Sequence, residues 1–142
     1  MRIMAIDYGD AHTGVAISDP TGFLTGFTTT ITAYRPETVT EQITALVQEH
    51  SVEELVLGYP RNMDGTLGPR AEKAEALSRL LRDTTGLPVA LWDERRTTID
   101  AHQILFNAGK NGKKRKKTVD AVAASLILEG YLTYKKNQQH QT

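Results

Sequence analysis

The chain has 142 residues, enough for one ordinary domain in which helices pack on a sheet but not for two lobes. It contains no cysteine, which excludes disulfides, thiolate zinc sites and thiol nucleophiles, and its four histidines show no ligand spacing, which disfavours a zinc enzyme. The net charge is zero, but the charges are unevenly distributed along the chain. Residues 1–109 contain nine Lys and Arg and fifteen Asp and Glu, whereas residues 110–142 contain eight Lys and Arg and two Asp and Glu, so the C-terminal quarter is strongly basic.

A membrane protein or a secreted protein is not expected. No apolar run approaches the roughly 18 residues that a membrane span requires. The first seven residues lead directly into a strand-like segment, without the charged flank and long apolar stretch of a signal peptide. A reducing compartment fits the absence of cysteine, so we expect a soluble, cytoplasmic protein.

The first third of the chain predicts three strands in a meander and then a helix. Apolar runs over residues 2–7 and 14–19 flank a turn that contains Gly9, as in a hairpin. A Thr-rich run over residues 24–31 is typical of a third strand. The hydrophobic period changes to that of a helix over residues 37–50. The apolar face of this helix is formed by Val39, Ile43, Leu46 and Val47.

The middle of the chain alternates strand and helix. Residues 54–57 predict a buried strand, and a loop over residues 58–68 leads to a helix that begins at Pro69 and ends near Gly86. Residues 88–92 predict the last strand. The inner stripe of the intervening helix is formed by Ala74, Leu77, Leu80 and Leu81.

Two more helices complete the chain. Thr97 and Asp100 form a capping box for a helix over residues 97–107. After a basic loop, Thr118 is expected to cap a final helix, which frays from Lys135 onward. The inward face of that helix is formed by Val119, Val122, Ala123, Leu126 and Ile127.

This order of elements predicts an α/β fold, with a mixed five-stranded sheet flanked by helices. The last two strands follow helical crossovers, so they should run parallel to the first, whereas the second strand of the hairpin is antiparallel to it. We expect a single domain over residues 1–136 and a disordered polar tail over residues 137–142.

Two acidic residues follow strands that are expected to be parallel. Asp7 ends the first strand and Glu94 comes just past the last one, so both should emerge at the edge where open α/β sheets bind ligands. With one strand between them, the two backbones would lie about 10 Å apart, too far for a direct hydrogen bond between the carboxylates. A hard divalent cation such as Mg²⁺ is the natural bridge, because it accepts carboxylate oxygens, keeps waters and binds substrate phosphate.

Asp120, in the first turn of the final helix, supplies a third carboxylate if that helix points its N-terminus toward the same edge. Three such acids suit a pair of cations roughly 4 Å apart, of which one generates the attacking hydroxide and the other stabilises the leaving oxygen. Each acid also has an ordinary interpretation, as a turn former, a surface residue or a helix-start residue. Asp7 is the hardest to explain in that way, because an acid at the end of a buried strand costs free energy unless it is paired or ligated. Asp93 competes with Glu94 for the second position, and the residues alone do not separate the two neighbours.

A dense positive run ends three residues before Asp120. A helix start that brings Asp120 to a metal also brings this run to the rim of the same cleft, where it can hold a nucleic acid backbone. The alternatives are a solvated loop and a nuclear localisation signal. The run consists of Lys110, Lys113, Lys114, Arg115, Lys116 and Lys117.

The loop over residues 58–68 follows the central strand at the same edge, and long loops in that place are often functional. Tyr59 either stacks on a base or belongs to the half-buried core. We expect His12 at the surface and Trp92 in the core. Phosphate contacts are expected from Arg61, Asn62 and Arg70.

Four groups of short motifs follow one another along the chain. They are Ala5-Ile6-Asp7-Tyr8-Gly9 with Gly14-Val15-Ala16 and Ser18-Asp19, Gly58-Tyr59-Pro60 with Asn62-Met63-Asp64-Gly65-Thr66, Asp93-Glu94-Arg95 with Thr97-Thr98, and Val119-Asp120-Ala121-Val122-Ala123-Ala124. Each motif is weak alone, but the ordered set is specific. Together they resemble the YqgF, or RuvX, family, described as pre-16S ribosomal RNA nucleases and as Holliday-junction-resolvase-like, nearly from end to end.

The resemblance implies a ribonuclease-H-like fold with strand order 3-2-1-4-5 and an antiparallel second strand. It carries catalytic and metal-binding roles onto Asp7, Glu94 and Asp120, which favours Glu94 over Asp93, and it adds Arg95 to the expected nucleic acid contacts. It also implies hydrolysis of phosphodiester bonds to a 5′-phosphate and a 3′-hydroxyl, with Mg²⁺ or Mn²⁺ as cofactor.

One position departs from the family pattern. Many members have Lys in the first turn where this chain has Ala11, so a phosphate contact there is missing or supplied elsewhere.

Four functions are open on this basis. The first is a nuclease that acts on structured RNA, in 5′ end processing of pre-16S ribosomal RNA, and the second is the same chemistry on branched DNA such as a Holliday junction. The third is an ATPase or sugar-kinase-like protein, since Asp-x-Gly before a glycine-closed hairpin also occurs there, although those proteins close two lobes over a nucleotide. The fourth is a nucleic-acid-binding module without catalysis.

Overall fold

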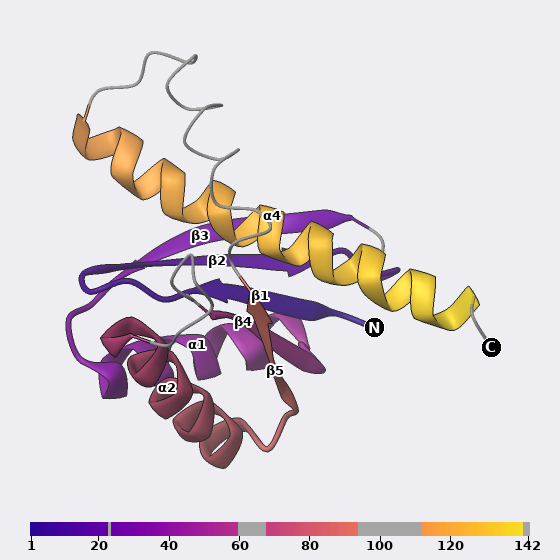
Figure 1. Cartoon of the computed structure of the whole chain (residues 1–142), viewed down its shortest axis with the longest axis horizontal. Coiled ribbons are helices and arrows are strands. Elements are labelled where there is room, and N and C mark those ends of the chain that lie inside the picture. The colour runs from indigo at the N-terminus through magenta and orange to yellow at the C-terminus, as the bar shows by residue number, and fades with distance from the viewer. Residues whose placement is uncertain (23, 60–67, 94–111, 141–142) are drawn as a thin grey trace.

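One sheet lies between two layers of helices in a computed structural model of the chain (Figure 1). The structure describes residues 1–22, 24–59, 68–93 and 112–140, with the backbone alone at residues 112–120, 139 and 140. The strands are β1 (Ile3–Asp7), β2 (His12–Ser18), β3 (Thr25–Thr32), β4 (Glu54–Tyr59) and β5 (Val89–Asp93), and the helices are α1 (Pro36–His50), α2 (Pro69–Thr85) and α4 (Gly112–His140). No helix in these ranges is long and apolar enough to cross a membrane.

The sheet has the strand order β3-β2-β1-β4-β5. β1 pairs antiparallel with β2 and parallel with β4, β4 pairs parallel with β5, and β2 pairs antiparallel with β3. The C-terminal ends of β1, β4 and β5 therefore meet at one edge. The prediction of a mixed five-stranded sheet with an antiparallel second strand is confirmed.

Both faces of the sheet are apolar because successive side chains of a strand point to opposite sides. Met4 and Ile6 of β1 belong to the cluster under α1 and α2, whereas Ile3 and Ala5 belong to the cluster under α4. Burial on both faces explains why the sequence of the central strands is continuously apolar rather than alternating.

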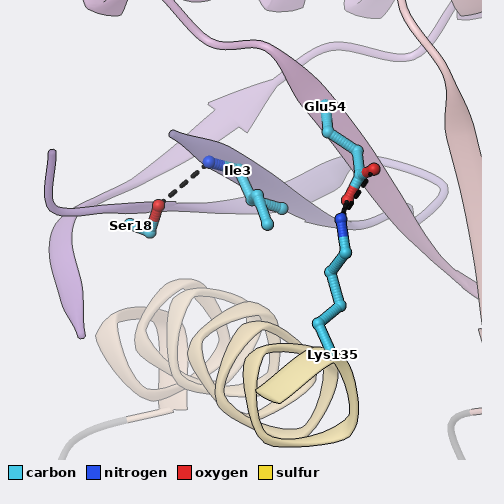
Figure 2. Close-up of polar contacts among 4 residues, drawn as sticks. All are labelled: Ile3, Ser18, Glu54 and Lys135. Carbon is cyan, nitrogen blue, oxygen red and sulfur yellow. Dashed lines mark hydrogen bonds and ion pairs between the residues drawn. The ribbon is translucent and has the colours of Figure 1, made fainter. Parts of the chain in front are cut away.

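α4 runs opposite to β1, so its N-terminal half points toward the edge where the parallel strands end (Figure 1). At the other edge, the Lys135 Nζ donates to the two carboxylate oxygens of Glu54, the first residue of β4, at 3.0 and 2.8 Å (Figure 2). Beside this ion pair, the N–H of Ile3 donates to the Ser18 hydroxyl at 2.9 Å. These contacts anchor the C-terminal part of α4 and the start of β1 at the edge remote from Asp7.

The boundaries of α4 differ from the prediction. The helix begins at Gly112 rather than at Thr118, so basic residues 113–117, expected in a loop, lie in helical backbone. Lys and Arg are good helix formers, and no proline interrupts the run. The helix also continues to His140 rather than fraying from Lys135, whose side chain is held by Glu54.

The buried stripes of two helices differ in detail from the prediction. Val122 and Leu126, expected inside, are half-buried. Leu80 of α2, also expected inside, is 36% exposed, while Ser78 is buried and donates its hydroxyl to the carbonyl of Glu75. The buried residues of α4 are Ala123, Ala124, Ile127, Leu128, Tyr131 and Leu132.

The other described elements begin and end within two residues of the predicted positions. The helix expected over residues 97–107 and most of the loop over residues 58–68 lie outside the described residues.

Candidate active site

Asp7 is the last residue of β1, at the edge where the three parallel strands end. It is half-buried, and it follows four residues that are buried. Strand alternation places it on the face of Ile3 and Ala5, which α4 covers. A carboxylate in this position loses much of its hydration and requires polar or charged partners, for which a hard cation is chemically suited.

Both cross-strand neighbours of Asp7 are glycines. Gly14 of β2 is its partner in the antiparallel ladder, and Gly58 of β4 follows Leu57, the partner of Ile6. Neither neighbour can project a side chain beside the carboxylate. Both glycines belong to the sequence motifs, but no role was predicted for them, although glycine inside a strand often marks a close approach.

Asp93, the last residue of β5, lies on the other face of the sheet. It pairs with Tyr59 in the ladder between β5 and β4, and Tyr59 donates a hydrogen bond to Glu75 of α2. Trp92, one residue earlier, packs in the cluster under α4, as expected of a core residue. Asp93 and Asp7 are therefore on opposite faces, and Asp93 does not meet Asp7. Glu94 lies outside the described residues.

Asp120 belongs to α4, where the structure describes its backbone. Its position is three and four residues before Ala123 and Ala124, which begin the described part of the stripe that packs on the sheet. Position 120 therefore continues that stripe toward the edge that carries Asp7. The topology thus brings Asp7 and helix position 120 to the same face, which is the condition for a shared site.

The residues expected to bind nucleic acid are described to different extents. Arg70 is exposed in the first turn of α2. The basic residues 113–117 lie in the first turns of α4, where the backbone is described. Lys110 and three of the other expected contacts, Arg61, Asn62 and Arg95, lie outside the described residues.

Two ring side chains near the site have structural roles. Tyr59 is 6% exposed, so it belongs to the core rather than to a stacking surface. His12, expected at the surface, is half-buried at the start of β2, with its Nδ1 3.4 Å from the Thr32 hydroxyl.

Tyr8 follows Asp7 but packs against the cluster under α1 and α2. Burial raises the pKa of the Tyr8 hydroxyl above its usual value of 10.0, and the negative charges of Asp10 and Glu37 raise it further. Tyr8 is therefore neutral at physiological pH and adds no negative charge beside Asp7.

The donor chemistry at the end of β1 fits a hard divalent cation, because a half-buried carboxylate supplies the oxygen ligands that Mg²⁺ and Mn²⁺ prefer. Within the described side chains, no three His, Asp or Glu residues come close enough to hold a metal ion. The described set contains Asp7 and Asp93 but neither Glu94 nor the side chain of Asp120.

A protein-family model described as "RuvX: Holliday junction resolvase" matches residues 1–134. A curated relative from Halothermothrix orenii, named "Putative pre-16S rRNA nuclease", is 46% identical over 140 residues, which is 99% of this chain and 99% of the relative.

Two solved structures are similar over nearly the whole chain. T. thermophilus RuvC in complex with a Holliday junction substrate has a TM-score of 0.63 at 11% identity and covers 96% of both chains. The Fowlpox virus resolvase, in complex with Holliday junction DNA, has a TM-score of 0.56 at 10% identity and covers 94% of this chain and 98% of the resolvase. At these identities the likeness shows the fold, and it confirms the prediction of a ribonuclease-H-like architecture.

Proposed function

The chain belongs to the RuvX family and is a nuclease, and we propose that it hydrolyses phosphodiester bonds of pre-16S ribosomal RNA during 5′ end processing. The observation that carries the proposal is the environment of Asp7. Its carboxylate is half-buried at the C-terminal end of β1, it has a glycine on each neighbouring strand, and it lies on the face crossed by α4. The match to this nuclease family over residues 1–134 argues against the third hypothesis, an ATPase or sugar-kinase-like protein.

We assign the catalytic carboxylates to Asp7, Glu94 and Asp120. Asp7 and helix position 120 share a face of the sheet. Glu94 is chosen over its neighbour because Asp93 is on the opposite face, beside Tyr59. The three acids come from β1, from the segment after β5 and from α4, so their convergence depends on how α4 is seated on the sheet.

The proposed site takes Mg²⁺ or Mn²⁺, since three carboxylates and no soft ligand suit a hard cation. Such cations, when bound, promote deprotonation of a water and offset the charge that develops on the leaving oxygen. The contribution of the chain is to hold Asp7 rigidly, because β1 is hydrogen-bonded on both sides and buried on both faces.

We propose that the basic residues at the start of α4 hold the nucleic acid backbone. The structure changes the form of this hypothesis, because basic residues 113–117 belong to the same helix as position 120 rather than to a loop before it. Positive charges within two turns of a catalytic carboxylate can neutralise the phosphates on either side of the scissile bond. The proposed contacts are Lys113, Lys114, Arg115, Lys116 and Lys117 of α4, with Arg61, Asn62, Arg70 and Arg95.

Branched DNA is the second candidate substrate, because the matching family model is described as a Holliday junction resolvase. The two substrates use the same carboxylates, so only a direct comparison separates them. The cytoplasmic location expected from the sequence stays a prediction.

The deciding experiment incubates the full chain with precursor 16S ribosomal RNA that carries its 5′ extension and, separately, with a four-way DNA junction. Each reaction is run with Mg²⁺, with Mn²⁺ and with a chelator, beside Asp7→Asn and beside Asp93→Asn as the matched control. Cleavage of the RNA that needs a divalent cation, is abolished in Asp7→Asn and persists in Asp93→Asn supports the proposal. Preferential cleavage of the junction would show that branched DNA, not RNA, is the substrate. Tight binding without cleavage of either nucleic acid would favour a binding module without catalysis.

A further inference from the structure

We propose that Gly130 is a positioning residue, whose close contact with Trp92 helps to set where α4 lies over the sheet and so where helix position 120 lies relative to Asp7. The inference rests on the proposed function and deepens it. It comes from a glycine in the interior of a long helix, a place where glycine is unfavourable unless something requires a close approach.

The contact is between the helix backbone and the indole ring. A Cβ at Gly130 would lie 3.0 Å from Cζ2 of Trp92, 3.5 Å from its Cε2 and 3.6 Å from its Nε1. An alanine therefore requires the ring, the helix or the end of β5 to move by a few tenths of an ångström.

The indole ring packs against two tyrosines of α4. Trp92 is 8% exposed, and its ring meets Tyr131 edge-on, with the ring centroids 6.0 Å apart. A second edge-on contact joins it to Tyr134, at 5.9 Å between centroids. A Cβ at Gly130 would therefore displace either the Trp92 ring, at the expense of these two ring contacts, or the backbone of α4.

Trp92 is level with Asp7 in the sheet. It pairs with Gly58 in the ladder between β5 and β4, and Gly58 is the strand neighbour of Asp7. Asp7, Gly58 and Trp92 thus form one row on the face covered by α4, at the C-terminal edge of the sheet. Gly130 rests on Trp92 at the end of that row, and Glu94 follows Trp92 by two residues.

The sheet hydrogen bonds fix β1, β4 and β5 to one another, but α4 is seated by side-chain contacts. One anchor is the ion pair of Lys135 with Glu54 at the remote edge. The Gly130 contact is the second anchor, five residues nearer the N-terminus of α4 and on the side of the proposed site. Together with the apolar stripe of α4 that packs on the sheet, these two contacts bear on the position and direction of the helix, and hence on the place of residue 120.

The test compares Gly130→Ala and the larger Gly130→Val with the wild-type chain in the RNA cleavage assay. Glu129→Ala is the matched control, because it introduces alanine at an exposed position in the same turn of α4. We expect Gly130→Ala to lower kcat about tenfold, since a small misplacement of catalytic groups is costly. Gly130→Val should lower it further, and KM should stay within about twofold, since the phosphate contacts lie elsewhere.

Three readouts separate positioning from simple stability. Mn²⁺ binding, measured by calorimetry without substrate, should weaken in Gly130→Ala but not in Glu129→Ala. The emission of Trp92, the single tryptophan of the chain, should shift in the same variant. The double variant Trp92→Phe/Gly130→Ala should regain most of the kcat, because Phe lacks the ring atoms that the new Cβ would meet.

A contact without catalytic consequence gives the opposite pattern. Alanine is the better helix former, so Gly130→Ala would then raise the Tm and leave kcat and Mn²⁺ affinity unchanged, which overturns the inference. If Gly130→Ala does not fold, Trp92→Phe alone is used, and wild-type kcat and Mn²⁺ affinity in that variant likewise overturn it.

Asp7→Asn is run in parallel, to separate failure of the inference from failure of the proposed function. Full activity in Asp7→Asn refutes the proposed function. An inactive Asp7→Asn together with a fully active Gly130→Ala refutes only the positioning role.

Discussion

Asp93 lies directly opposite Tyr59 in the parallel ladder between β5 and β4, on the sheet face that α2 covers. Asp7 is at the same edge of the sheet but on the face that α4 covers. Two acids that the sequence presents as equivalent strand-end residues are therefore separated by the thickness of the sheet.

This separation predicts different outcomes for the two isosteric substitutions. Asp7→Asn should lower kcat by about 10²-fold or more, because it removes a charged oxygen ligand of the proposed cations. Asp93→Asn should retain kcat within about threefold, since its side chain does not reach the α4 face. Single-turnover cleavage rates at saturating Mn²⁺ check both. Equal decreases in the two variants would contradict the assignment of the site to the α4 face.

The ion pair of Lys135 with Glu54 should contribute to stability. The side chains are 32% and 13% exposed, so the pair is largely shielded from water. Lys135→Met should lower the free energy of unfolding by about 2 kcal/mol, mainly because the largely buried Glu54 carboxylate loses its positively charged partner. Urea denaturation measures this decrease. In the double variant Lys135→Met/Glu54→Gln part of the decrease should disappear, and strict additivity of the two single changes would show that the pair is not coupled.

Tyr131 should make stability depend on pH at the alkaline end. Burial raises the pKa of its hydroxyl above the usual 10.0, and the hydrogen bond to Glu54 and the charge of Glu54 raise it further. The folded chain thus holds this proton more tightly than the unfolded chain does. Its contribution to stability is fully present below pH 10 and is lost as the pH rises above that value.

Urea denaturation at pH values on both sides of about 10 tests this dependence. Tyr131→Phe should show a shallower fall of the unfolding free energy with rising pH than the wild-type chain. Tyr34→Phe is the control, because it makes the same change at an exposed tyrosine. If Tyr131→Phe and Tyr34→Phe follow the wild-type slope equally, the titration of Tyr131 does not contribute.

The turn after Asp7 should be sensitive to a single methyl group. A Cβ at Gly9 would collide with the carbonyl oxygen of His12, whereas a Cβ at Gly86 meets nothing within 4 Å although its φ is +72°. Gly9→Ala should therefore cost about 2 to 3 kcal/mol of unfolding free energy. Gly86→Ala should cost only about 1 kcal/mol, from backbone strain. Thermal and urea denaturation measure both, and an unperturbed Gly9→Ala would mean that the turn relaxes freely.

The basic residues at the start of α4 should act on binding rather than on chemistry. Replacing residues 113–117 by glutamine should weaken RNA binding and lower the slope of log affinity against log salt by about one for each phosphate that is no longer bound. The kcat at saturating RNA should change little. Arg79→Gln removes an exposed charge from α2 and should leave the slope unchanged. A salt slope equal to that of the wild-type chain would place the phosphate contacts elsewhere.

Local patterns were sufficient for most of the fold and for part of the site. The switch between a period of 2 and a period of 3.6 is a property of neighbouring residues, so the strands and helices could be placed within two residues where they are described, α4 excepted. Right-handed crossovers made β4 and β5 parallel to β1. Asp7 could be singled out because an acid at the end of a strand buried on both faces is costly wherever the strand lies.

The start of α4 was beyond the local signals, because a Thr that can cap a helix can equally continue one. The inner stripe of α4 was predicted only in part: Ala123 and Ile127 are buried as expected, but Val122 and Leu126 are half-buried. Any of several adjacent faces of an Ala- and Leu-rich helix is apolar enough to be buried. Which face is buried depends on the partner surface, here the sheet face that carries Ile3, Ala5, Ala16, Val56 and Trp92.

The amino-acid sequence by itself determined the elements, their order and the one strand-end carboxylate whose burial demands a partner, because these follow from interactions between near neighbours along the chain. Only the tertiary structure decided that Asp93 is turned away from Asp7, that glycines flank Asp7 on both sides, and that the backbone of α4 at Gly130 lies close against the Trp92 ring. These depend on which surfaces meet, and packing between distant segments is set by shape complementarity that no local pattern encodes.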